Sequence, residues 1–190
     1  MFRLALIVAL ATLSHVATFQ YASAAEPGQP TAPSSSPPSS PSSPATTAGD
    51  RITAAIIARE LKALGHSATV DIDDSGDPRV NMSIDGYDWS IYFYDCAPGA
   101  RDDRQCASYQ FYSGYTLKQP ASPDVINKWN TQQRYAKAYT YVQRSGSHSA
   151  RIEIDVRSAD TGADPGRTFR VYFNVMKDKA ALFRKTVGYP

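Results

Sequence analysis

The sequence predicts an α+β domain in which an antiparallel sheet of about six strands is packed with three helices, in the order α-ββββ-α-ββ-α. Two kinds of pattern lead to this prediction. Several segments alternate apolar and polar residues and are joined by short turn signals, as in hairpins. Other segments repeat apolar residues at steps of three and four, as in helices that lie on a core. We expect one domain over residues 50–190, which is long enough to bury a core.

The chain begins with the features of a secretory signal peptide over residues 1–25. A short apolar run follows Arg3, and small residues follow the run. Because Ser14 and His15 interrupt it, the run is a poor membrane span, although a retained membrane anchor is the alternative. Residues 26–49 consist mainly of Pro and Ser and are expected to form a disordered tether. We therefore expect export, most simply to the periplasm of a Gram-negative bacterium.

The first helix is expected over residues 51–64, with Asp50 as its cap and Gly65 as its stop. Two alternating strands follow, and the stretch DIDDSGDP at 71–78 connects them. This stretch matches the front half of an EF-hand loop, but Met82 stands where a bidentate Glu is required. We interpret it as a polar turn, and we expect neither a metal site nor a cofactor.

The chain has only two cysteines, Cys96 and Cys106, and each ends or begins a predicted strand. Asp85-Gly86 predicts a two-residue hairpin before the first of these strands. In an exported chain the cysteine pair predicts a structural disulfide at the base of the loop between the strands. A redox-active pair is the alternative, which the wide spacing disfavours. Alternation places both cysteines on the more polar face of the sheet.

The second half of the chain shows equally clear local signals. Ser122-Pro123-Asp124 has the cap, the proline and the acid of a helix start. The period then changes to two in YAKAYTYV, and a returning strand contains Ile152. The last helix is expected to begin at Asp164-Pro165 and to bury a long apolar stripe.

Several of these segments together resemble the YbjN-like family of bacterial sensory transduction regulators. They are DDSGDP, DGYDWSIYFYDC, CASYQFYSGY and VINKWNTQQRYAKAYTYV, and the similarity extends over roughly residues 51–187. The most specific part is Trp129-Asn130 followed by RYAKAY, which is similar to the family's WN…RFARAY stretch. The resemblance implies a fold like that of type III secretion chaperones and a non-enzymatic role.

Composition and motifs argue against two function classes. The net charge is only +2, and no Lys/Arg block suited to a nucleic-acid backbone is present. His66 and His148 stand in different segments without metal-ligand spacing, and no G-x-S-x-G turn occurs. We therefore expect no enzyme; a hydrolase assembled by tertiary contacts is the weakest alternative.

Trp129, Asn130 and Arg134 are the strongest single candidates for a functional cluster. We expect structural roles for them, with ligand binding as the alternative. Trp129 would anchor the second helix on the sheet, Asn130 would end that helix and satisfy backbone groups, and Arg134 would pair with a carboxylate.

A further candidate is a sheet face rich in tyrosine, of which the chain has 12. Alternation places Tyr92, Tyr94 and Tyr112 on the more polar face, and Tyr139 and Tyr141 are expected to join them. If helices cover this face, the hydroxyls need partners. If the face is open, it is suited to binding a peptide or another subunit.

The sequence thus favours an exported binding, chaperone-like or regulatory module that holds a protein or peptide partner, with a homodimer as one arrangement. The alternative is an envelope domain that binds glycan or peptidoglycan by stacking on Tyr92, Tyr94 and Tyr112. No nucleic-acid partner is expected, and membrane attachment is expected only if the signal segment is uncleaved.

Overall fold

The computed structural model describes residues 51–190, so the expected signal segment, the tether and Asp50 lie outside the described residues. The helices and strands follow the predicted order. They are α1 (Ala54–Ala63), β1 (Ala68–Ile72), β2 (Pro78–Ile84), β3 (Tyr87–Cys96), β4 (Cys106–Leu117), α2 (Pro123–Gln132), β5 (Lys137–Val142), β6 (His148–Arg157) and α3 (Pro165–Thr186).

The strands form one six-stranded antiparallel sheet in the order β1-β2-β3-β4-β6-β5. The first four strands are sequential neighbours. The chain then leaves the sheet to form α2, returns at the far edge as β5, and enters the sheet interior as β6 beside β4. The predicted α+β class and element order are therefore confirmed.

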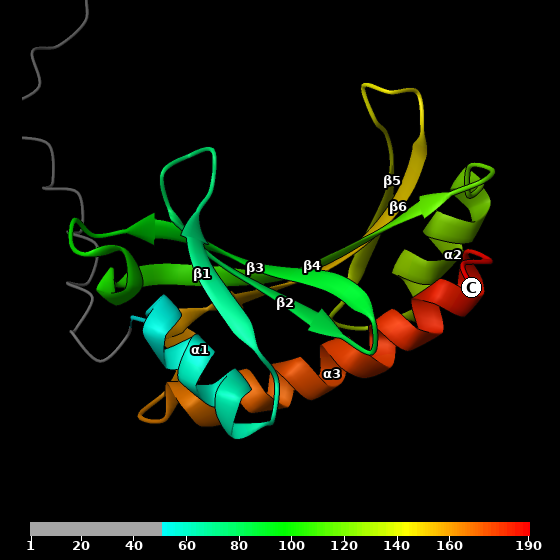
Figure 1. Ribbon diagram of the computed structural model, residues 1–190. Coiled ribbons are helices and arrows are strands. Elements are labelled where there is room, and N and C mark those ends of the chain that lie inside the picture. The colour runs from blue at the N-terminus through cyan, green and yellow to red at the C-terminus, as the bar shows by residue number, and fades with distance from the viewer. Residues whose placement is uncertain (1–50) are drawn as a thin grey trace, which may run out of the picture. The chain divides into compact units, whose positions relative to one another are not determined.

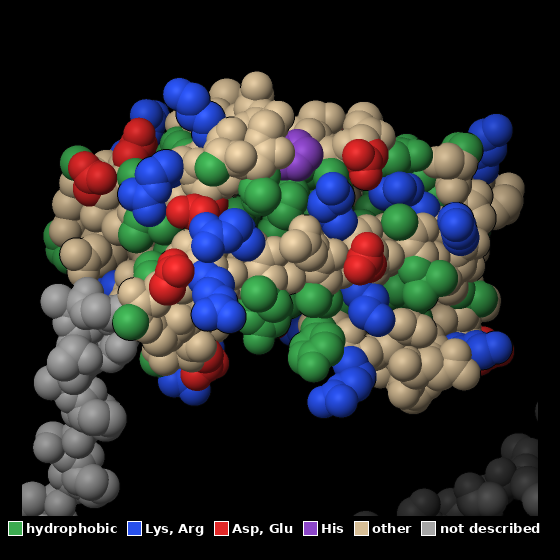
Figure 2. All heavy atoms as spheres, turned by 90° about the horizontal axis from the view of Figure 1, so that it is seen from below, with side chains coloured by type: hydrophobic (Ala, Val, Ile, Leu, Met, Phe, Trp, Pro, Cys, Tyr) green, Lys and Arg blue, Asp and Glu red, His purple; other side chains and the backbone are tan. Residues whose placement is uncertain are grey.

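The core lies between the sheet and the helices, which cover the same side of it (Figure 1). Alternate residues of the central strands point to this side, among them Trp89, Ile91 and Phe111, and α3 supplies Phe169 and Phe173. Figure 2 shows the helix side of the molecule, where Lys and Arg side chains predominate over Asp and Glu. No helix within residues 51–190 is long and apolar enough to span a bilayer.

Helix α1 begins later than predicted. Its cap is Thr53, whose side-chain oxygen accepts a hydrogen bond from the Ile56 N–H. Ile52 was expected to be helical, but it pairs with Cys106 in an isolated bridge through two backbone hydrogen bonds. Because these bonds require extended backbone, the prediction of a start at Arg51 was wrong.

The other start and stop signals are confirmed. Gly65 ends α1 with a φ of 82°, a left-handed conformation that glycine adopts without cost. Asp85 and Gly86 connect the paired residues Ile84 and Tyr87 as a two-residue hairpin. Ser122 and Asp164 cap α2 and α3 through their side-chain oxygens.

The acidic stretch 71–78 is the turn between β1 and β2, as interpreted. The Asp73 carboxylate accepts hydrogen bonds from the backbone N–H groups of Ser75 and Asp77. Asp71 forms an ion pair with Arg79 across the hairpin. These carboxylates are therefore engaged by protein donors. Within residues 51–190, no group of three or more His, Cys, Asp or Glu side chains could hold a metal ion.

A disulfide joins Cys96 to Cys106, which lie opposite each other on β3 and β4. The predicted pairing across the two strands is thus present. Alternation did not anticipate that Cys106 is fully buried. The strand pairing with Ile52 and a hydrogen bond from Ser158 to the Cys106 carbonyl cover this end of β4.

Candidate functional site

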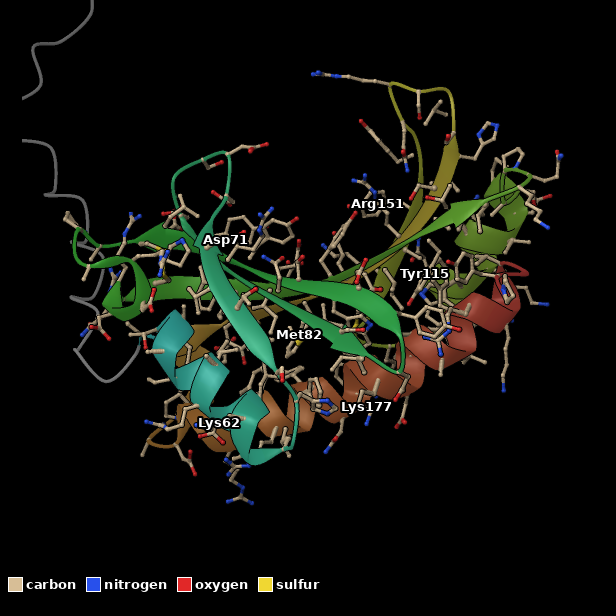
Figure 3. All side chains as sticks on the ribbon, in the orientation of Figure 1. Lys62, Asp71, Met82, Tyr115, Arg151 and Lys177 are labelled. Carbon is tan, nitrogen blue, oxygen red and sulfur yellow. A yellow bond between two sulfur atoms is a disulfide. The ribbon has the colours of Figure 1, made fainter. Side chains whose placement is uncertain are left out.

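The candidate site is the face of the sheet that lacks a helix in the part of the chain that the structure describes (Figure 1). We call it the open face. Figure 3 shows Asp71 and Arg151 on this side, whereas Lys62 and Lys177 lie on the helix side. The β1–β2 and β5–β6 hairpins rise beyond the central strands on the open side (Figure 1).

Five tyrosines lie on the open face, as their alternation predicted. Tyr92 and Tyr112 pack edge to face, with ring centroids 5.6 Å apart. Tyr94 and Tyr141 are 40% and 42% exposed, and Tyr139 is half-buried. No helix from residues 51–190 covers these rings, so they form an accessible aromatic surface rather than a second core.

The pKa values of three tyrosines on this surface, Tyr94, Tyr112 and Tyr139, are raised above the ordinary value. Burial raises the pKa of Tyr112 to about 12, against an opposing effect of Arg151. Burial also raises the pKa values of Tyr94 and Tyr139, helped by the nearby carboxylates of Asp155 and Glu153 respectively. Neutral phenols can both donate and accept hydrogen bonds, which suits recognition of polar groups.

The β1–β2 side of the open face contains a bidentate ion pair. Arg79 donates from Nε and Nη2 to the two oxygens of Asp71, at 3.0 and 2.7 Å. The hydrogen bond from Arg79 lowers the pKa of Asp71. The guanidinium carbon of Arg79 also lies 5.9 Å from the Tyr92 ring centroid. Arg79 is therefore already paired with a carboxylate and lies beside an aromatic ring.

A chain of polar contacts crosses the centre of the open face. The Tyr94 hydroxyl donates to Gln110, and the Gln110 amide donates to Asp155 at 2.7 Å. Lys137 lies 2.7 Å from Asp155 and 3.3 Å from Glu153. Partial burial raises the pKa of Asp155, but the bonds from Lys137 and Gln110 outweigh it and lower that pKa. Both acids of β6 thus have a cation within the face.

Arg151, also on β6, lies between two tyrosine rings. Its guanidinium carbon is 4.2 Å from the Tyr141 centroid and 5.5 Å from the Tyr112 centroid. Arginine faces stack favourably on aromatic rings. Its Nε is buried and has no hydrogen-bond partner among the described residues.

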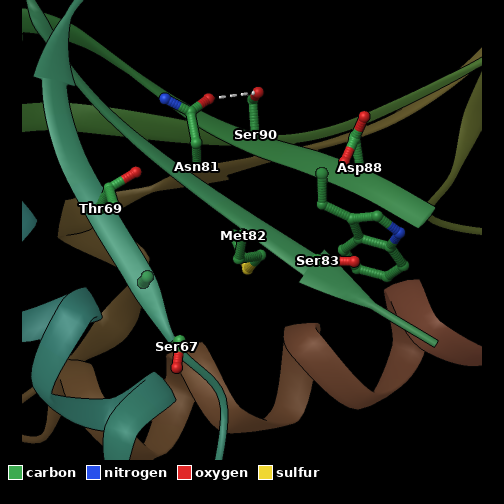
Figure 4. Close-up of a pocket in the computed structure, with 9 residues that line it drawn as sticks. Ser67, Thr69, Asn81, Met82, Ser83, Asp88 and Ser90 are labelled. Atoms are coloured by element: carbon green, nitrogen blue, oxygen red, sulfur yellow. Dashed lines mark hydrogen bonds between the residues drawn. The ribbon is translucent and has the colours of Figure 1, made fainter. Parts of the chain in front are cut away.

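A shallow hollow of about 480 Å³ lies beside β1 and β2. Figure 4 shows that Asn81 and Ser90 are joined by a hydrogen bond at its border, from the Ser90 hydroxyl to the Asn81 carbonyl oxygen. Asp88 is its one carboxylate, and no histidine or cysteine lines it. The lining can donate and accept hydrogen bonds, but it presents no nucleophile with an adjacent base.

The three single candidates have different surroundings. Trp129 is 3% exposed, donates from Nε1 to the Ala136 carbonyl and packs against Phe183 of α3 at 4.9 Å. It therefore fixes α2 to α3 and to the start of β5. This supports its expected structural role as an anchor of α2. The anchor is α3 as well as the sheet.

Asn130 has one of its two expected roles, since its amide satisfies backbone groups, and Arg134 departs from the role expected of it. Asn130 lies inside α2, which ends at Gln132, and its amide bonds the backbone of Ala138 in β5. It therefore does not end the helix. Arg134 was expected to pair with a carboxylate, but no described acid lies within ion-pair distance. Its guanidinium lies over the Tyr135 ring at 5.4 Å.

The two described histidines do not assemble a hydrolytic site. His66 packs against Phe173, with ring centroids 5.4 Å apart, and lines a hollow that contains Ser67 but no acid. His148 lies at the start of β6, opposite Leu117 and Val142. Neither arrangement supports the hydrolase alternative.

Arg151 and Gly114 are site residues that the sequence did not single out. They are direct neighbours across β6 and β4. The alternation of Arg151 with Ile152 in the predicted strand showed that Arg151 lies on the more polar face of the sheet. It did not show which residues of other strands lie beside it. A basic residue on the same face as the tyrosines is the signal that could have found it.

The comparisons with known proteins support the resemblance stated above. A family model described as "Putative bacterial sensory transduction regulator" matches residues 53–182. The matched segment starts at the cap of α1 and ends within α3, so it includes every strand of the sheet. No curated protein matches the chain.

Proposed function

Because this chain belongs to the YbjN family, we propose that it is a non-enzymatic regulatory module that holds a segment of a protein partner on the open face of its sheet. The family description is that of a regulator. Holding a partner is the simplest way in which a domain without an assembled catalytic set regulates another protein.

The observation that carries the proposal is the exposed tyrosine surface on the sheet face opposite the helices. Aromatic side chains are enriched at protein interfaces because they bury a large area at small entropic cost. Tyr94 and Tyr141 retain substantial exposure, and Tyr92 and Tyr112 lie between them in the sheet. A partner that covered these rings would gain apolar contact while its polar groups met the neutral hydroxyls.

Polypeptide is a better match than glycan for this surface. Sugar rings stack on flat aromatic faces, but the Tyr92 and Tyr112 rings meet at 85° and form no common platform. Both rings also have an arginine as a neighbour, which favours an occupant with polar or charged groups. Peptidoglycan binding is kept as an outcome of the experiment below.

We place this function in the periplasm. The signal-like sequence at residues 1–25 and the Pro/Ser-rich tether at 26–49 support export. The Cys96–Cys106 disulfide supports an oxidising compartment, since such bonds rarely persist in a reducing cytosol. Mass spectrometry of the mature protein tests both points, by its N-terminal residue and by the absence of free thiols. An intact N terminus with two free thiols would contradict the location.

Site-specific photo-cross-linking in intact cells tests the function. The cross-linking residue replaces Tyr94 on the open face, and the control replaces Val171, which is 55% exposed on α3. We expect a discrete protein adduct from position 94 that is absent from position 171 and is lost with Tyr92→Ala. Equal adducts at both positions, or adducts with peptidoglycan fragments alone, would refute the choice of partner. An adduct of twice the chain's mass would identify a second copy as the occupant.

A further inference from the structure

We propose that Arg151 recognises a carboxylate of the bound segment, so that the open face selects acidic polypeptides. The carboxylate is either an Asp or Glu side chain or a free C terminus. This inference rests on the function proposed above and specifies the chemistry of the partner.

Arg151 is held in place before any ligand binds. Its guanidinium lies 4.2 Å from the ring centroid of Tyr141 and 5.5 Å from that of Tyr112. These contacts with two rings restrict its long side chain. A fixed guanidinium loses less entropy when it binds a carboxylate with two parallel hydrogen bonds.

The acids of the open face are paired with cations other than Arg151. Asp71 is bound by Arg79, and Asp155 and Glu153 are both within ion-pair distance of Lys137. No described acid lies within ion-pair distance of Arg151, and its buried Nε lacks a hydrogen-bond partner among residues 51–190. A buried donor without a partner is costly. A carboxylate from the ligand would supply the counter-charge that Arg151 lacks through the terminal guanidinium nitrogens, since Nε itself is closed to solvent.

Gly114 lets the side chains of Tyr112 and Arg151 lie close to the backbone of β4 on the open face. A Cβ at Gly114 would lie 3.1 Å from the Tyr112 hydroxyl oxygen and 3.7 Å from Cγ of Arg151. Both side chains therefore lie over the glycine, where another residue would hold them apart. The neutral hydroxyl of Tyr112 lies over Gly114, as does the Arg151 side chain, and can donate to a bound carboxylate.

The test uses synthetic peptides of one length with alternating Thr and Tyr. One pair contains a central Glu or Gln, with the C terminus amidated in both. A second pair has Gln at the centre and either a free or an amidated C terminus. Fluorescence anisotropy measures binding to the full mature protein. We expect the peptides with a carboxylate to bind about tenfold or more tightly than their neutral partners, as charge-assisted hydrogen bonds do. The two pairs distinguish a side-chain carboxylate from a C-terminal one.

Substitutions then test whether Arg151 causes the preference for peptides with a carboxylate. Arg151→Gln should remove most of the advantage of the acidic peptides, and Arg151→Lys should retain part of it because it keeps the charge but loses the fork. Arg157→Gln is the matched control, because Arg157 is an exposed arginine on the same face of β6. It should leave the preference unchanged. Urea unfolding of each variant confirms that the fold is kept.

The outcomes separate the two proposals. If neutral and acidic peptides bind wild-type protein equally, or if Arg157→Gln acts like Arg151→Gln, the role of Arg151 is wrong while polypeptide binding stands. If no peptide binds but purified peptidoglycan does, the polypeptide function fails and the inference fails with it.

Discussion

The side-chain amide of Asn130 forms two hydrogen bonds with the backbone of Ala138. Its Nδ2 donates to the Ala138 carbonyl at 2.9 Å, and its Oδ1 accepts from the Ala138 N–H at 2.8 Å. β5 is an edge strand of the sheet. The amide thus supplies the pair of bonds that a further strand would supply, which fixes α2 to β5 and occupies part of an otherwise unpaired edge.

Replacing this amide should destabilise the domain. Asn130→Ala removes both bonds and leaves two partly buried backbone groups unpaired, so we expect a loss of about 2 kcal/mol in the free energy of unfolding. Asn130→Asp keeps the acceptor but places a carboxylate oxygen against the Ala138 carbonyl, and should also destabilise. Urea denaturation measures both. Thr131→Ala, at the next position of α2, which is also exposed, is the control; equal losses at the two positions would show that the amide has no special role.

The disulfide should contribute a moderate part of the stability. Cys96 and Cys106 are separated by ten positions, and closing a loop of this length stabilises by about 2–3 kcal/mol. We therefore expect reduction to lower the free energy of unfolding of the wild-type chain by this amount while the sheet remains folded. Urea curves of oxidised and reduced protein give the difference. A reduced chain with unchanged stability would mean that β3 and β4 pair equally well without the bond.

The elements that the sequence predicted well are those defined by local chemistry. The hairpin at Asp85-Gly86 and the helix starts at Ser122 and Asp164 depend on neighbours within a few residues. Alternation also predicted which tyrosines share a face, because the side-chain period of a strand is fixed. The start of α1 was missed because a distant partner, Cys106, holds Ile52 in extended backbone.

The site depended on contacts that no local pattern encodes. Strand alternation does not show whether a second layer covers a face. The exposure of the tyrosine surface therefore could be known only from the packing of all three helices. Asn130 was expected to end α2, but its actual partner, Ala138, lies eight positions away in β5. The role proposed for Arg151 depends on its contacts with the rings of Tyr112 and Tyr141, which belong to two other strands.

The core contains a hydroxyl that should lower stability. Tyr109 is fully buried on the helix side of β4, and its hydroxyl has no hydrogen-bond partner among the described residues. Burial raises its pKa well above the ordinary value. Tyr109→Phe removes the unpaired group and keeps the ring, so we expect a gain of about 1 kcal/mol in the free energy of unfolding.

The control for this gain is Tyr87→Phe. The Tyr87 hydroxyl donates to the Pro190 carbonyl at 3.0 Å, so its removal should give no gain. Thermal and urea unfolding compare both variants with the wild type. A loss of stability in Tyr109→Phe would show that the hydroxyl has a partner, such as an internal water.

The raised pKa of Tyr112 predicts a loss of stability at alkaline pH. In the unfolded chain this phenol ionises near its ordinary pKa of about 10, whereas burial raises its pKa in the folded protein to about 12. Its contribution is therefore fully present below about pH 10 and is lost as the pH rises toward 12, because the unfolded state releases its proton first. Tyr112→Phe keeps the ring and removes the titration. Urea unfolding across this pH range should show a shallower decline for the variant than for the wild type. The remaining decline comes from other groups whose pKa values are raised, namely Tyr94, Tyr109, Tyr139 and Lys137. Identical declines for the two proteins would mean that Tyr112 is as well solvated in the folded chain as in the unfolded one.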